Sequence, residues 1–105
     1  MIPTEVPEGV DLKNLGWDSL IAVETKSRSY HIEFLGGHAI RISGHPEYCP
    51  QPERALLQGS LDDEGVVEMD LIEPGKRLIL LLDDTRHFMT SRVVSVQVDP
   101  SRYSA

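Results

Sequence analysis

The segment of residues 29–43, SYHIEFLGGHAIRIS, constrains the fold more than any other part of the chain. Apolar and polar residues alternate on both sides of Gly36-Gly37, as they do in strands that bury one face. Glycine readily adopts the positive φ angles that a two-residue hairpin turn requires. The segment therefore predicts a β-hairpin, with His38 at the start of its second strand and on the same face as the two isoleucines that follow.

Further strands are predicted on both sides of this hairpin, because short apolar runs alternate with Gly, Pro and Asp turn signals. The runs cover residues 19–25, 54–61, 66–69, 76–83 and 87–98. A helical turn is the alternative for residues 54–61. Val93 beside Val94 indicates either two buried faces or a bulge. The pattern predicts an all-β fold, a small partly open β-barrel or sandwich of about five to seven short antiparallel strands.

The length and the two ends of the chain predict one domain. A chain of 105 residues has room for a single modest core. Residues 1–10 contain two prolines and predict an irregular lead-in, and residues 100–105 predict a polar tail. Between the lead-in and the first strand, DLKNLGW at residues 11–17 predicts one short helical turn that buries its leucines and Trp17.

The charge of the chain disfavours nucleic acid as a partner. Seventeen acidic residues stand against 10 basic ones, a formal net charge of −7, and a phosphate backbone is repelled by such a surface. Only a spatial cluster of Lys76, Arg77 and Arg92 would reverse that expectation. The acidic stretch of residues 62–73 could bind a cation, but it lacks the alternating oxygen ligands of an EF-hand loop. We interpret it as a solvated turn and edge strand.

The sequence predicts a cytoplasmic protein without a membrane segment. The single cysteine cannot form an internal disulfide, which fits a reducing compartment. The first residues lack the basic region and apolar run of a signal peptide. The longest apolar run is far shorter than the roughly 20 residues that a membrane-spanning helix needs.

The strongest candidate for a functional segment is the proline-rich loop of residues 44–52, GHPEYCPQP. Three prolines stiffen it, and a stiff loop loses little entropy on binding. Tyr and Arg are favoured interface anchors, so His45, Tyr48, Cys49 and the nearby Arg54 are the expected binding residues. We expect a non-catalytic binding or assembly module without a cofactor. Its partner would be another protein, or a second copy through a strand edge. The loop could equally only cover the open end of the barrel.

A competing hypothesis is a metal or thiol site built from His38, His45 and Cys49. Zinc takes imidazole and thiolate ligands, and the His-x3-Cys spacing can place two of them on one ion, with His31 or His87 as additional ligands. The same residues could form a Cys nucleophile with a His base. The sequence shows only one such close pair, whereas structural zinc sites have two. Convergence of the three side chains in space would decide between the hypotheses.

The closing segment, PGKRLILLLDDTRHFMTSRVVSVQVD, resembles a pattern in small uncharacterised bacterial β-rich proteins. In that pattern a Gly-led aliphatic strand precedes a Thr-Ser-x-Val strand. The resemblance covers at most half of the chain. It implies a bacterial small β-barrel domain and carries no activity and no catalytic residue. Thr90 and Ser91 themselves are interpreted as strand hydroxyls that form hydrogen bonds, because no nucleophile motif surrounds them.

Overall fold

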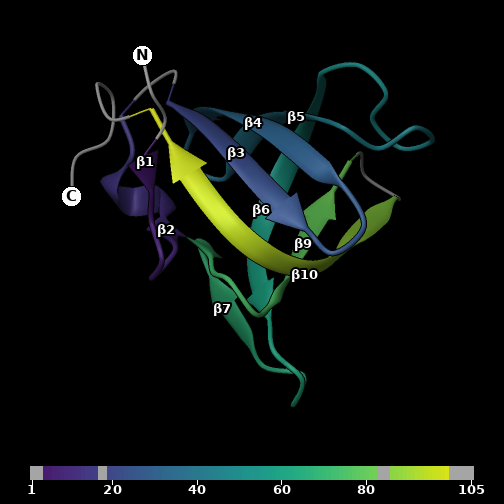
Figure 1. Cartoon of the computed structure of the whole chain (residues 1–105). Coiled ribbons are helices and arrows are strands. Elements are labelled where there is room, and N and C mark those ends of the chain that lie inside the picture. The colour runs from purple at the N-terminus through teal and green to yellow at the C-terminus, as the bar shows by residue number, and fades with distance from the viewer. Residues whose placement is uncertain (1–3, 17–18, 83–85, 100–105) are drawn as a thin grey trace.

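A computed structural model of the chain describes residues 4–16, 19–82 and 86–99. These residues form ten strands and one turn of 3-10 helix, which confirms the all-β prediction (Figure 1). The elements are β1 (Thr4–Glu5), β2 (Val10–Asp11), η1 (Leu12–Asn14), β3 (Leu20–Thr25), β4 (Ser29–Gly36), β5 (Ala39–Ser43), β6 (Glu53–Leu61), β7 (Val67–Met69), β8 (Leu71–Ile72), β9 (Arg77–Leu81) and β10 (His87–Val98). Within the described ranges, no helix has the length and apolarity to cross a membrane.

Six of the strands form a ring of antiparallel pairs. The order is β3, β4, β5, β6, β9 and β10, and β10 returns to pair with β3. Two long strands make this closure possible. The first half of β10 pairs with β9 and the second half with β3, while β6 pairs with β5, then with β7, and along its other edge with β9. The hairpin of β6 and β7 extends away from the ring, and β2 pairs with β8 in a separate small sheet (Figure 1).

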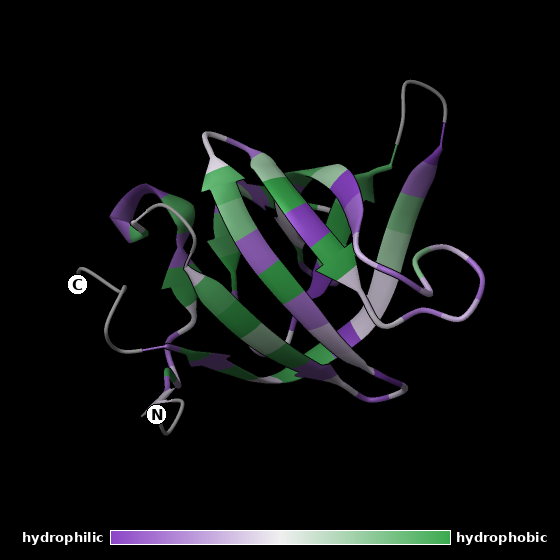
Figure 2. Cartoon of the chain, turned by 90° about the horizontal axis from the view of Figure 1, so that it is seen from above, coloured by the Kyte–Doolittle hydropathy of each residue, from purple (hydrophilic) through white to green (hydrophobic). Residues whose placement is uncertain are grey.

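The core lies inside this ring and is filled by aliphatic side chains from every strand of it. Alternate residues of β4 and β5 are buried, as their sequence pattern predicts, and the intervening ones face outward. Figure 2 shows the resulting hydrophobic and hydrophilic bands along the strands. Full burial of an aliphatic side chain contributes about 1.5–3 kcal/mol. The largest fully buried side chains are Leu12, Ile21, Ile32, Ile40, Ile42, Leu57, Ile72, Leu78, Leu80, Val10, Val23 and Val96.

The hairpin between β4 and β5 turns one residue later than predicted. A register shift between Phe34 and Gly36 absorbs one residue, and Gly36 then pairs with Ala39. The glycines at positions 36 and 37 have φ angles of 109° and 60°, a region that other residues rarely adopt. The two-residue turn is therefore formed by Gly37 and His38. His38 lies at the tip of the hairpin and not on the inner face of the strand, which corrects the prediction.

Other differences occur near the two ends of the chain. The lead-in is not wholly irregular, because Thr4 and Glu5 pair with the end of β10. The helical turn is present as η1. Leu12 at its start and Leu15 directly after it are buried as predicted. Of the two alternatives for Val93 and Val94, β10 has the bulge, which buries Val93 and leaves 56% of Val94 exposed. Trp17, the turn at 83–86 and the tail at 100–105 lie wholly or mostly outside the described residues.

Candidate functional site

The proline-rich loop 44–52 is held in one conformation by its own hydrogen bonds. The backbone N–H of Gly44 donates to the carbonyl of Cys49 at 2.9 Å, and the N–H of Cys49 donates to the carbonyl of His45 at 3.1 Å. The imidazole Nδ1 of His45 accepts from the N–H groups of Glu47 and Tyr48, at 3.0 and 3.2 Å. The loop is therefore as stiff as its prolines predict, and the imidazole is one of its internal braces.

Aromatic contacts attach this loop to the barrel. The rings of His45, Tyr48 and Phe88 lie with their centroids 4.7–5.3 Å apart, and the ring of Tyr30 lies 5.9 Å from that of Phe88. Cys49, which belongs to the loop, is completely buried. A polar cavity of about 250 Å³ lies between the loop and β10. Of the three loop residues expected to bind a partner, only Tyr48 is substantially exposed, at 39%.

The environment of Cys49 and His45 opposes a reactive thiol. Burial raises the pKa of the Cys49 thiol, so less of it is thiolate at neutral pH. Burial and the neighbouring Arg28 guanidinium lower the pKa of His45. An imidazole whose Nδ1 accepts two N–H groups is in its neutral form, and this nitrogen cannot also serve as a base. These two residues stabilise the loop and do not form a nucleophile with its base.

The zinc hypothesis fails because its three residues do not converge. His38 precedes β5 and His45 follows it, so the strand separates the two imidazoles. The Nδ1 atom of His38 instead lies 2.7 Å from Oδ1 of Asp70, beside a cavity of about 320 Å³. In the part of the chain that the structure describes, no three His, Cys, Asp or Glu side chains are grouped closely enough to hold a metal ion.

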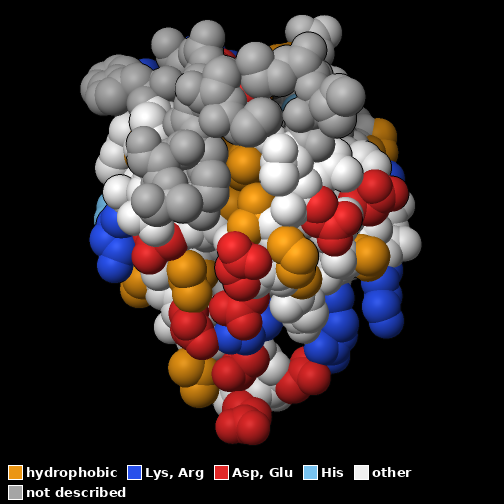
Figure 3. All heavy atoms as spheres, turned by 60° about the vertical axis from the view of Figure 1, so that its left-hand side comes forward, with side chains coloured by type: hydrophobic (Ala, Val, Ile, Leu, Met, Phe, Trp, Pro, Cys, Tyr) orange, Lys and Arg blue, Asp and Glu red, His pale blue; other side chains and the backbone are white. Residues whose placement is uncertain are grey.

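The basic residues that could have attracted nucleic acid do lie together, but Lys76 and Arg92 are paired with acidic side chains. Arg77 and Arg92 are cross-strand partners, and Lys76 precedes Arg77. The ammonium of Lys76 lies 2.8 Å from a carboxylate oxygen of Glu68, and Arg92 pairs with Asp63. Figure 3 shows acidic side chains over the lower part of the molecule, where the β6–β7 hairpin extends, with basic ones beside them. The stretch 62–73 therefore supplies counter-charges to this cluster, and the surface does not favour phosphate.

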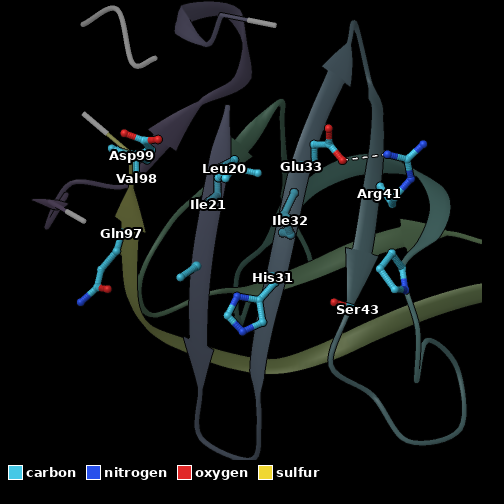
Figure 4. A pocket seen from close by; sticks show the side chains of 12 residues that line it. Leu20, Ile21, His31, Ile32, Glu33, Arg41, Ser43, Gln97, Val98 and Asp99 are labelled. Atoms are coloured by element: carbon cyan, nitrogen blue, oxygen red, sulfur yellow. Dashed lines mark hydrogen bonds and ion pairs between the residues drawn. The ribbon is translucent and has the colours of Figure 1, made fainter. Parts of the chain in front are cut away.

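A second candidate site is a groove of about 460 Å³ on the outer face of β10, β3, β4 and β5 (Figure 4). The strand register places its outward side chains in two rows that cross the sheet. The first row runs through Gln97, Ala22, His31, Ser43 and Pro52. The second row runs through Asp99, Leu20, Glu33, Arg41 and Arg54. Arg54 stands directly beyond the lining of the groove, opposite Arg41.

The size of the side chains explains why this face is hollowed. Ala22 and Ser43 are small, and they flank His31 in the first row. The residues between the rows, such as Ile21 and Ile32, point their side chains into the core, so the apolar surface of the groove comes from the outward Leu20 and Ala22. On the rim Leu20 is 53% exposed, and Nη1 of Arg41 lies 2.7 Å from Oε1 of Glu33 (Figure 4). Apolar surface with a few fixed polar groups is the usual composition of a binding site.

The sequence did not predict the groove, although the alternating pattern placed His31, Glu33 and Arg41 on the face opposite the apolar residues. Alternation places His31 and Glu33 on the outer face of β4, but pairing registers decide which outward residues become neighbours. Of the predicted binding residues, Arg54 lies at the edge of the groove. His45, Tyr48 and Cys49 lie in the loop between β5 and β6, outside the groove lining. The loop does contribute Pro52 to the groove wall. The sequence signal that could have predicted it was two small outward residues, Ala22 and Ser43, on the strands that flank the polar His31.

Comparison of the chain with protein-family models, with curated proteins and with solved structures finds no match. The function is therefore argued from the geometry of the two candidate sites.

Proposed function

We propose that this protein is a non-catalytic binding module that holds an extended segment of a partner protein in the groove on the outer face of β10, β3, β4 and β5. The observation that supports it most is the double row of outward side chains, which combines exposed apolar surface with fixed polar groups on rigid strands. The stiff loop 44–52 contributes Pro52 to the groove wall. The loop that the sequence marks as the functional segment would therefore help to shape the binding site.

The dimensions of the groove favour an extended peptide. The two rows cross five strands, which gives four inter-strand spacings of about 4.8 Å, or about 19 Å in all. The rows stand two residues apart along each strand, about 7 Å, which is the width of one chain. An extended peptide advances about 3.3 Å per residue, so about six residues fill the groove. The exposed Leu20 and the small Ala22 offer a shallow apolar seat for one side chain of that segment.

A catalytic role has less support from the same residues. His31 and Ser43 are cross-strand partners in the groove, the two residue types that a serine nucleophile and its base would require. The carboxylate of Glu33, which would have to orient such an imidazole, instead pairs with Arg41. The module hypothesis needs no such constellation.

Self-association through a strand edge also has less support. Among the described strands the outer ones of the sheet are β1 and β7, with two and three residues. Short edges limit the number of main-chain hydrogen bonds that a second copy could add, and charge on β7 at Glu68 protects that edge.

The test is selection of random peptides displayed on phage against the immobilised protein, followed by affinity measurement with the synthesised peptides. Ala22→Trp fills the groove from an outward strand position, whereas Val94→Trp adds the same bulk at an exposed position outside it. We expect at least about tenfold weaker binding to the first variant and unchanged binding to the second, with circular dichroism showing both folded. Selection of no peptide, or of peptides that tolerate Ala22→Trp, would overturn the proposal. A loss confined to Tyr48→Ala would place the site on the loop and equally overturn it.

A further inference from the structure

The β6 end of the groove carries one of two cross-strand arginine pairs in the described sheet, the other being Arg77 and Arg92. Arg41 and Arg54 are directly opposite each other on neighbouring strands and face outward. Like charges in this position destabilise a sheet, and the chain as a whole has a net charge of −7. Two guanidinium groups side by side thus concentrate positive charge at one end of the groove.

One carboxylate offsets only part of this charge. Arg41 is paired with Glu33 at 2.7 Å, and both side chains are partly exposed. Within the described residues, Arg54 is exposed and forms no ion pair. A positive charge thus remains at the β6 end of the second row, whereas the acidic Asp99 stands at its β10 end. The charge of the second row therefore changes from negative at Asp99, next to β10, to positive at Arg54 on β6.

We infer that the partner segment carries an Asp or Glu side chain that binds at Arg54 and Arg41, which sets its position in the groove. This inference rests on the proposed function and names the chemistry of the ligand. A planar guanidinium binds a carboxylate through two parallel hydrogen bonds, and the flanking arginine adds a second source of donors. Binding of the acid offsets the repulsion between the arginines as well as forming the contact.

The spacing of the segment follows from the strand positions. Leu20 on β3 and Arg54 on β6 are separated by three inter-strand spacings, about 14 Å. At about 3.3 Å per residue, an apolar side chain seated at Leu20 lies about four residues from the acidic one. The geometry leaves the direction of the bound chain open, so the acid either follows or precedes the apolar residue.

Charge reversal tests the inference. Peptides selected on the wild-type protein are expected to carry Asp or Glu about four residues from an apolar residue. Arg54→Glu should weaken their binding at least about tenfold, and selection on that variant should enrich Lys or Arg at the same place. Arg77→Glu makes the same change of charge on β9, outside the groove lining, and should leave affinity unchanged. Affinity of the wild-type protein should fall as salt is raised from 50 to about 500 mM, because salt screens exposed charges.

The outcomes separate this inference from the proposed function. Peptides that are lost on Ala22→Trp but show no acidic enrichment, or bind Arg54→Glu unchanged, overturn the acidic segment and leave the groove as the binding site. Peptides that tolerate both variants overturn both. Equal losses on Arg54→Glu and Arg77→Glu would reveal a general effect of net charge and would also overturn the inference.

Discussion

Thr90 offers a sharp test of how the barrel is held together. Its hydroxyl is buried where the pairing of β9 and β10 shifts register, and the backbone N–H of Leu78 donates to it at 3.0 Å. The same hydroxyl donates to the carbonyl of Ser91 at 2.7 Å. The side chain thus replaces a backbone partner at an irregular point of the sheet.

Thr90→Val keeps the shape of the side chain and removes the hydroxyl. The N–H of Leu78 then stays buried without a partner, which costs about 1–3 kcal/mol. Ser91 is partly exposed, so its carbonyl can bind water instead, and we expect a total loss of about 2 kcal/mol. In a domain of this size that lowers Tm by roughly 8–16 °C.

Thr90→Ser supplies the matched control, because it keeps the hydroxyl and removes only a methyl group, a cost of about 1 kcal/mol. Urea unfolding followed by circular dichroism should therefore rank the wild type above Thr90→Ser, and Thr90→Ser above Thr90→Val, with similar m-values. A Val variant at least as stable as the Ser variant would refute the reasoning, since apolar packing would then outweigh the hydrogen bond at this point.

The remaining predictions concern the loop 44–52. Because the folded-state pKa of His45 is lowered below its unfolded value of about 6.5, the unfolded chain binds a proton first as the pH falls. Stability should therefore be full above pH 6.5 and decrease below it, and His45→Asn, which can still accept the N–H groups, should reduce that decrease in thermal melts between pH 7.5 and 5; an unchanged slope would contradict this role. The buried Cys49 thiol, whose pKa is raised by burial, should react with iodoacetamide at pH 7 at least about a hundredfold more slowly in the native than in the urea-unfolded protein. Comparable rates would show that the loop opens.

The sequence predicted most of the fold because its strands are locally punctuated. The bounds of β10 coincide with the predicted run of residues 87–98, and residues 54–61 form a strand and not a helical turn. The errors fall where tertiary pairing overrides a local pattern. Thr4 and Glu5 have no strand pattern of their own, and they become a strand only because β10 offers an unpaired edge. His38 shifted into the turn because a bulge consumed one residue of the expected register.

The candidate site was harder to predict than the fold. Cys49, His45 and the prolines were chosen as candidates because rare residue types stand close together. In the structure His45 and Tyr48 pack against Phe88 and hold the loop on the barrel, and Cys49 is buried. The groove consists of common residues, Ala22 and Ser43 among them, whose meaning depends on which residues face them across the sheet. Such neighbours come from four different strands, and no motif within a single segment encodes them.

The position of β10 has a consequence for how this protein is made. One strand near the carboxyl end closes the ring by pairing with both β3 and β9. Without β10 the ring would have two unpaired edges, on β3 and β9, and unpaired edges are the kind of surface on which chains associate wrongly. Nascent chains that stall before residue 87 should therefore depend on chaperones far more than completed ones. Pairing of β10 with β3 and β9 covers the edges through which incomplete chains would associate.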